Sequence, residues 1–316
     1  MMRKALIHLD FPAKHLVVLR ERYPELQFVI NKEKDGLLKQ LEDTEVLITF
    51  QCTKEMVAGA PKLKWIQGVS AGIDAMPLEE ITSREIILTN GKGIHGTHMA
   101  EYALAAMISL ARNLHLVFRN QTKRKWERDI LQGEIFGATV GILGLGSIGK
   151  EVAKKASLMG MKVIGLKNTP ESMEYVDHVY GPEEMDEVFI ESDYVINLLP
   201  HTQQTHGIIN KRHFQLMKET ACFINMGRGR TVNEEDLIEA LQNDEIRALF
   251  TDVFEEEPLP EESPLWEMEN VVITPHICGE SYKYMDHAME IIEHNLKVYL
   301  YKKGEMINLV DFNSGY

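Results

Sequence analysis

The sequence predicts an α/β protein with two parallel sheets. Two separate series of short apolar segments rich in β-branched residues run along the chain, and helical or charged segments lie between many of their members. That alternation is typical of parallel strands joined by crossover helices. With 316 residues, of which 44% are hydrophobic and 26% charged, the chain is long enough for two globular cores.

The first series predicts the strands of one sheet, at residues 4–9, 27–30, 45–50, 63–69 and 85–90. A long helical stretch follows at residues 97–121, and its many alanines imply close packing against other helices. Its inward face is expected to hold Ala100, Ala103, Ala106, Leu110, Leu114 and Val117.

The second series predicts a separate α/β unit, with strands within residues 138–144, 161–166, 192–200, 221–227, 248–254 and 271–276. A helix expected at residues 283–304 could carry the chain back to the first domain. Its inward residues are expected to be Met285, Met289, Ile292, Leu296 and Tyr299. No Pro/Gly-rich linker separates the two series, so the domain boundaries are expected on helices.

Composition argues against several classes of protein. A formal net charge of −14 repels phosphate backbones, so we expect no nucleic-acid partner, and the basic run 123–128 is expected to be a solvated or subunit-contacting surface. Cys52, Cys222 and Cys278 are too far apart for a disulfide framework or a metal site. No segment approaches the roughly 20 apolar residues of a membrane span, and the start lacks a signal peptide. We therefore expect a cytoplasmic protein without a membrane partner.

A glycine-rich turn opens the second series, directly after an apolar strand and directly before a helical pattern. That context is what a dinucleotide-binding turn requires. Gly144 permits the tight turn, Gly146 lets the backbone approach a pyrophosphate, and Gly149 lets the helix pack closely on the strand. The N–H groups at the helix start, around Ser147 and Ile148, would then hold the phosphate.

The next strand is not followed directly by an acidic residue. NAD-binding turns place an Asp or Glu there to accept hydrogen bonds from the ribose hydroxyls. Here Lys167, Asn168 and Thr169 follow instead. Lys167 would attract the 2′-phosphate of NADP, and the other two could donate to its oxygens. The sequence favours NADP(H), with NAD(H) as a possible second cofactor because lysine lacks arginine's bidentate fork.

Three later strands each end beside a polar residue. Arg228 follows the first, Asp252 and Glu257 follow the second, and His276 follows the third. Ligands of open α/β sheets bind at such strand ends. Reduction of an oxo acid by hydride needs a cation for the carboxylate, a proton donor and a group that orients the donor. Arginine, histidine and a carboxylate suit these roles.

Together these motifs resemble the D-isomer-specific 2-hydroxyacid dehydrogenase family. The resemblance runs in order along nearly the whole chain, through GVSAGID, TNGKGIHGTHMAEYAL, GILGLGSIG, LLPHTQQTHGIIN, INMGRGRTVNEEDLIEAL, DVFEEEPL and TPHICG. Several motifs in the right order are far more specific than any one of them.

The resemblance implies a role for each matching position. Arg228 matches the substrate-binding arginine, Glu257 the acidic partner and His276 the acid/base. Ala71 and Gly72 match the backbone N–H pair that receives the substrate carboxylate. Further cofactor contacts are expected at Pro200, Thr205, Met226, Asp252, His276 and Gly279, where Asp252 matches the residue that holds the nicotinamide carboxamide.

The resemblance also implies an architecture and a reaction. A Rossmann dinucleotide-binding domain, residues 100–283, would be inserted into a flavodoxin-like substrate domain, residues 1–99 plus 284–316, and both sheets would be doubly wound. We expect a homodimer that reduces a small 2-oxo acid, such as glyoxylate or hydroxypyruvate, to the D-2-hydroxy acid. No metal is expected, because His95 and His98 have no third ligand nearby in the sequence.

Two departures and two alternatives accompany this interpretation. Lys167 replaces the usual acid, and Cys278 stands where a small residue is usual; a thiol is small enough to be tolerated there. The chain ends at Tyr316, which argues against the longer phosphoglycerate dehydrogenases of the family. A dinucleotide-sensing, corepressor-like binding protein stays open as a function, although no disordered tails are expected. A formate or phosphite dehydrogenase is the other alternative.

Overall fold

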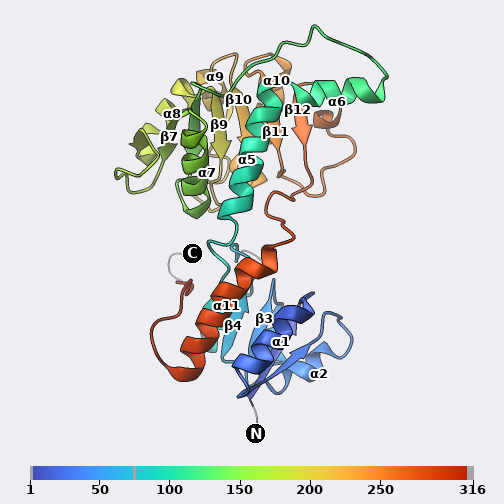
Figure 1. Cartoon of the computed structure of the whole chain (residues 1–316), viewed down its shortest axis with the longest axis vertical. Coiled ribbons are helices and arrows are strands. Elements are labelled where there is room, and N and C mark those ends of the chain that lie inside the picture. Colours follow the sequence, from blue (N-terminus) through green and yellow to red (C-terminus); the bar gives the residue numbers. More distant parts are fainter. Residues whose placement is uncertain (1–2, 74–75, 312–316) are drawn as a thin grey trace. The chain divides into compact units, whose positions relative to one another are not determined.

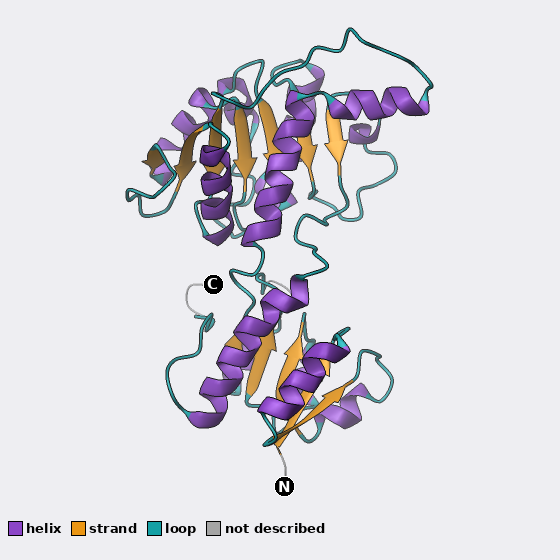
Figure 2. Ribbon diagram, in the orientation of Figure 1, coloured by secondary structure: helices purple, strands orange, loops and turns teal. Residues whose placement is uncertain are grey.

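The computed structural model describes residues 3–73 and 76–311, which form two compact units (Figure 1). One unit contains the chain up to His95 together with the chain from Ser281 onward, and the other is Gly96–Glu280. Each unit has its own parallel sheet with helices on its faces, so the expected α/β class with two doubly wound sheets is confirmed (Figure 2).

The sheet of the first unit has five parallel strands in the order β2-β1-β3-β4-β5. This is the flavodoxin-like order. The strands are β1 (Arg3–His8), β2 (Leu26–Ile30), β3 (Thr44–Thr49), β4 (Trp65–Gly68) and β5 (Ile87–Thr89). The helices are α1 (Ala13–Arg22), α2 (Leu37–Leu41), α3 (Lys54–Ala58), α4 (Leu78–Ser83) and α11 (Tyr284–Tyr301).

Alternate strand residues of the first unit belong to two cores. Ala5 and Ile7 pack with α1 and α11, whereas Leu6 packs with α2, α3 and α4. This division follows from the two-residue period of a strand. Helix α11 buries Met289, Ile292, Leu296 and Tyr299 as expected, while Met285 is partly buried.

The second unit has seven parallel strands in the order β12-β11-β10-β9-β6-β7-β8. They are β6 (Thr139–Leu143), β7 (Lys162–Leu166), β8 (His178–Tyr180), β9 (Tyr194–Asn197), β10 (Cys222–Asn225), β11 (Ala248–Thr251) and β12 (Val271–Ile273). The chain winds outward from β6 to β8, returns to β9 on the other side of β6, and then winds outward again. The strand order therefore reverses between β6 and β9, and ligands of such sheets bind at this switch point.

Helices cover both faces of this second sheet. Residues of α5 (Gly96–Ala111) and α7 (Ser147–Leu158) form one core with the strands. Residues of α8 (Met185–Glu191), α9 (Lys211–Leu216) and α10 (Glu234–Gln242) form the core on the other face. Helix α6 (Leu114–Thr122) follows α5. Among the described residues, no helix has both the length and the apolarity of a membrane span.

Each predicted strand segment contains an observed strand, but two details of the prediction were wrong. The single helix expected at 97–121 is two helices, because Asn113 adopts a left-handed conformation with φ of 48° and ends the first. As a consequence, Val117 is 40% exposed and does not continue the buried face of α5. Strand β8 was also missed, since its residues are exposed or only partly buried and it lacks the apolar run that marks the other strands.

Candidate active site

The glycine turn between β6 and α7 has the form that a pyrophosphate needs. Gly144 has a φ of +105°, and Gly146 is the N-cap of α7 with no side chain capping the helix. A Cβ added to Gly146 would meet no atom within 4 Å, whereas one on Gly149 would lie 2.2 Å from the Gly144 carbonyl oxygen. Open space thus lies over the helix start, where the N–H groups of Ser147 and Ile148 belong to the first turn. The donor set and the space fit a dinucleotide phosphate.

Strand β7 leads to the three residues that were expected to contact the 2′-phosphate. Asn168 and Thr169 are exposed, and the backbone N–H of Lys167 donates to the Tyr180 carbonyl oxygen at 3.0 Å. The Lys167 ammonium group forms an ion pair with the Glu171 carboxylate. This pair was not predicted from the sequence, because Glu171 stands four residues beyond the position where NAD-binding turns place an acid.

Asp252, directly after β11, is fully buried and organises the turn that carries His276. Its Oδ1 accepts hydrogen bonds from Thr274 Oγ1 at 2.6 Å and from the Ile277 N–H at 2.9 Å, and its Oδ2 accepts one from the Cys278 N–H at 2.9 Å. The His276 N–H donates to the Asp252 carbonyl oxygen at 2.9 Å. Both carboxylate oxygens therefore have donors within the protein, and Thr274 is a contributor that the sequence analysis did not find.

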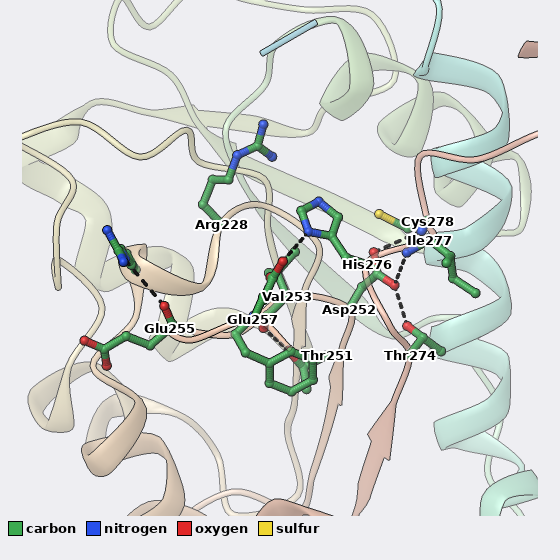
Figure 3. Close-up of polar contacts among 12 residues, drawn as sticks. Arg228, Thr251, Asp252, Val253, Glu255, Glu257, Thr274, His276, Ile277 and Cys278 are labelled. Carbon is green, nitrogen blue, oxygen red and sulfur yellow. Dashed lines mark hydrogen bonds and ion pairs between the residues drawn. The ribbon is translucent and has the colours of Figure 1, made fainter. Parts of the chain in front are cut away.

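His276 and Glu257 are in contact, as Figure 3 shows. The distance from His276 Nδ1 to Glu257 Oε2 is 2.7 Å, and Glu257 Oε1 accepts a hydrogen bond from the Phe254 N–H at 3.0 Å. The carboxylate is thus fixed by its own loop and in turn orients the imidazole. The His276 side chain is 48% exposed, so the Nε2 edge of the ring is available for a substrate oxygen.

Arg228 follows β10 and extends to the same side as His276 in the close-up of Figure 3. Its Nη1 donates to the Gly227 carbonyl oxygen at 2.9 Å, and its charge lies close enough to influence Cys278, two residues from His276. Because β10, β11 and β12 are neighbours in the sheet, the loops that follow them lie together. The second unit therefore brings Arg228, Glu257 and His276 to one edge.

The acid loop also contacts the segment after Arg228. Arg230 Nε donates to the Glu255 carbonyl oxygen at 3.4 Å, and Glu234 Oε2 accepts a hydrogen bond from the Glu255 N–H at 3.1 Å. Burial raises the pKa of the Glu234 carboxyl. The contact between Glu234 and Glu255 was not predicted from the sequence, because an acid in the first turn of a helix is common and indicates no particular partner.

The remaining expected cofactor contacts lie in the second unit. Thr205 Oγ1 donates to the Pro200 carbonyl oxygen at 2.6 Å, which closes the loop after β9. Met226 is buried in the core shared with α5 and α7, and its N–H donates to the Asn197 carbonyl oxygen at 3.1 Å. Gly279 is half-buried, and its carbonyl oxygen lies 2.9 Å from His98 Nε2.

The two residues expected to receive the substrate carboxylate belong to the first unit. Ala71 and Gly72 are half-buried in the loop after β4. Asn90 Nδ2 donates to the Ala71 carbonyl oxygen at 3.1 Å, and Ser70 Oγ donates to the Gly72 carbonyl oxygen at 2.9 Å. Nearby side chains therefore hold the carbonyl groups of both residues in place.

Cys278 is buried beside Asp252, and burial is the first of the causes that raise the pKa of its thiol. The protonated thiol is uncharged, so it adds no charge next to the Asp252 carboxylate. In the part of the chain that the structure describes, no group of three or more His, Cys, Asp or Glu side chains could hold a metal ion.

Comparisons with known proteins identify the family of this chain. The sequence model of the "D-isomer specific 2-hydroxyacid dehydrogenase, NAD binding domain" matches residues 104–278. A glyoxylate reductase of Pyrococcus horikoshii is 30% identical over 96% of this chain and 94% of its own length. A D-3-phosphoglycerate dehydrogenase of Methanocaldococcus jannaschii is 32% identical over 92% of this chain, which spans only 56% of that relative's length.

Solved structures share the fold. A D-isomer specific 2-hydroxyacid dehydrogenase family protein from Aeromonas salmonicida has a TM-score of 0.89 and 31% identity, covering 99% of this chain and 100% of its own. An NADPH-dependent glyoxylate/hydroxypyruvate reductase from Sinorhizobium meliloti, solved with NADP and sulfate, has a TM-score of 0.85 and 26% identity. It covers 99% of this chain and 100% of its own.

Proposed function

We propose that this chain, which belongs to the D-isomer specific 2-hydroxyacid dehydrogenase family, reduces a small 2-oxo acid to the D-2-hydroxy acid. It is an NAD(P)-dependent enzyme of that family. The main support for the proposal is the 2.7 Å contact between His276 Nδ1 and Glu257 Oε2. Arg228 extends to the same edge of the sheet (Figure 3).

His276 is the proton donor in this proposal. When bound at the glycine turn, a nicotinamide cofactor would supply hydride to the carbonyl carbon of the oxo acid, and the carbonyl oxygen would then need a proton. The protonated His276 donates its Nε2 proton to that oxygen, while its Nδ1–H stays hydrogen-bonded to Glu257. The carboxylate of Glu257 stabilises the imidazolium before the transfer and keeps the ring in one orientation.

Arg228 is the substrate anchor. A guanidinium group can donate two parallel hydrogen bonds to a carboxylate, and its positive charge also polarises the adjacent carbonyl group. The backbone N–H groups of Ala71 and Gly72, in the first unit, are also proposed as substrate-binding groups. Residues 1–99 with 284–316 would then be the substrate domain, and residues 100–283 the dinucleotide domain.

NADP(H) is the preferred cofactor in the proposal, and NAD(H) is the second. Lys167 provides a positive charge after β7 and no acid follows directly. The Sinorhizobium meliloti enzyme, which is described as NADPH-dependent, supports the same preference. Lys167→Asp should lower the preference for NADPH over NADH, and an unchanged ratio would show that the argument from Lys167 is wrong.

Glyoxylate and hydroxypyruvate are the proposed substrates, in line with the names of the similar reductases. The test is the absorbance at 340 nm with NADPH or NADH against a panel of 2-oxo acids. Oxidation of NADPH by these acids is expected. Tight dinucleotide binding without turnover of any 2-oxo acid would favour a sensing protein, and oxidation of formate or phosphite would favour that class of dehydrogenase.

A homodimer in the cytoplasm is also proposed. The segment after α6 exposes large apolar side chains, namely Trp126 at 92%, Leu131 at 83% and Phe136 at 75%. Large exposed apolar and aromatic side chains are enriched at subunit interfaces. Trp126→Asp should shift the molar mass measured by light scattering toward that of a monomer.

A further inference from the structure

The loop between β7 and β8 contains an acid that neutralises the expected phosphate-binding lysine. The Lys167 ammonium group pairs with the Glu171 carboxylate, and the exposed fractions of the two side chains are 25% and 62%. The carboxyl end of β6 leads into the glycine turn. The ion pair lies at the carboxyl end of β7, the strand next to β6. In this fold the adenosine ribose lies beside that strand end.

We propose that Glu171 limits the preference for NADP(H) by pairing with Lys167, so that the 2′-phosphate of NADP(H) must displace the carboxylate before it can bind the lysine. The inference rests on the proposed function, because it requires a dinucleotide at the glycine turn. Lys167 and Glu171 together would then determine the selectivity between NADP(H) and NAD(H).

Glu171 should affect the binding of NADP(H) and of NAD(H) differently, because only NADP(H) carries a 2′-phosphate. A phosphate monoester carries close to two negative charges at neutral pH and is repelled by a carboxylate that shares its lysine. The ribose hydroxyls of NAD(H) are donors, which a carboxylate accepts. Glu171 therefore disfavours NADP(H) without disfavouring NAD(H), and the chain can use both.

A second lysine lies within electrostatic range of the same carboxylate. Lys167 is the main cause of the lowered pKa of Glu171, and Lys150 of α7 contributes to the same effect. Removing the carboxylate would therefore leave two cations near the ribose site. The change should strengthen the binding of a phosphate more than that of a hydroxyl pair.

The test is equilibrium binding of NADPH and NADH, followed by the fluorescence of the reduced nicotinamide, without any oxo acid. Glu171→Gln is expected to lower the Kd for NADPH about two- to fivefold relative to that for NADH, the range of an exposed ion pair. Glu171→Lys should enlarge this shift. In a Lys167→Gln background the same Glu171→Gln change should leave the ratio of the two Kd values almost constant.

Glu174→Gln is the matched control, since it removes one exposed negative charge from the same loop. An equal shift in Glu174→Gln would overturn the inference, because the effect would then be general screening of charge. An unchanged ratio in Glu171→Gln would overturn it as well, while binding itself would still support the proposed function. Failure of the wild-type protein to bind either dinucleotide would instead remove the proposed function.

Discussion

The Nδ1 atom of His276 lies 2.7 Å from Oε2 of Glu257, across two loops that follow neighbouring strands. His276 has a left-handed backbone with φ of +55°, which is uncommon for residues other than glycine, although histidine adopts it more often than most. The bonds from residues 274–278 to Asp252 hold this conformation. The buried Asp252 carboxylate therefore fixes the backbone turn that holds His276, and the exposed Glu257 carboxylate orients the imidazole.

Glu257→Gln should lower kcat for oxo-acid reduction by about 10- to 100-fold, because a neutral amide stabilises the imidazolium less than a carboxylate does. Steady-state kinetics with saturating NADPH measure the change. Glu256→Gln is the control, since it alters the neighbouring exposed acid of the same loop. Equal activities of the two variants would contradict the assignment of Glu257.

Asp252→Asn should destabilise the protein and lower kcat together. An amide has one acceptor oxygen and one donor group, so at least one of the N–H groups that now bond to Asp252 would face another donor. A buried unsatisfied donor costs about 1 to 3 kcal/mol of unfolding free energy. Urea unfolding measures this loss, and Thr274→Val, which removes a single donor, should lose less. Wild-type stability in Asp252→Asn would refute the role of its hydrogen bonds.

Two glycine substitutions in the phosphate turn should have different effects. Gly146→Ala has open space for its methyl group and should fold normally, but the methyl group would occupy the space over the helix start. Its Kd for NADPH should rise about tenfold or more. Gly149→Ala would place a Cβ 2.2 Å from the Gly144 carbonyl oxygen and should lower the melting temperature. Unaltered NADPH binding by Gly146→Ala would contradict the proposed approach of the pyrophosphate.

The three thiols should react slowly in the folded protein. Burial raises the pKa of Cys52 to about 12 and also raises the pKa values of Cys222 and Cys278. A raised thiol pKa lowers the fraction of thiolate at a given pH, and the thiolate is the reactive form. At pH 8 a disulfide reagent should therefore label the native chain far more slowly than the urea-unfolded chain. Rapid labelling of any one cysteine in the native state would show that its surroundings are open.

Local patterns were enough to predict most strands and the glycine turn, because their signals lie within a few adjacent residues. The neighbouring positions of β10, β11 and β12 explain why polar residues after separate strands meet at one edge. Other features depend on the exact path of the backbone. Asn113 ends α5 by its backbone conformation, and Lys167 meets Glu171 only through the path of the loop. Neither feature leaves a periodic signal in the sequence.

The role of His276 as proton donor can be tested by a single-turnover reaction of NADPH-loaded protein with glyoxylate, followed at 340 nm. The wild-type protein is expected to oxidise the bound NADPH in one rapid phase. His276→Ala should still bind NADPH but oxidise the bound cofactor at least about 100-fold more slowly, since it lacks the proton donor. An equally fast phase in His276→Ala would show that His276 is not the proton donor.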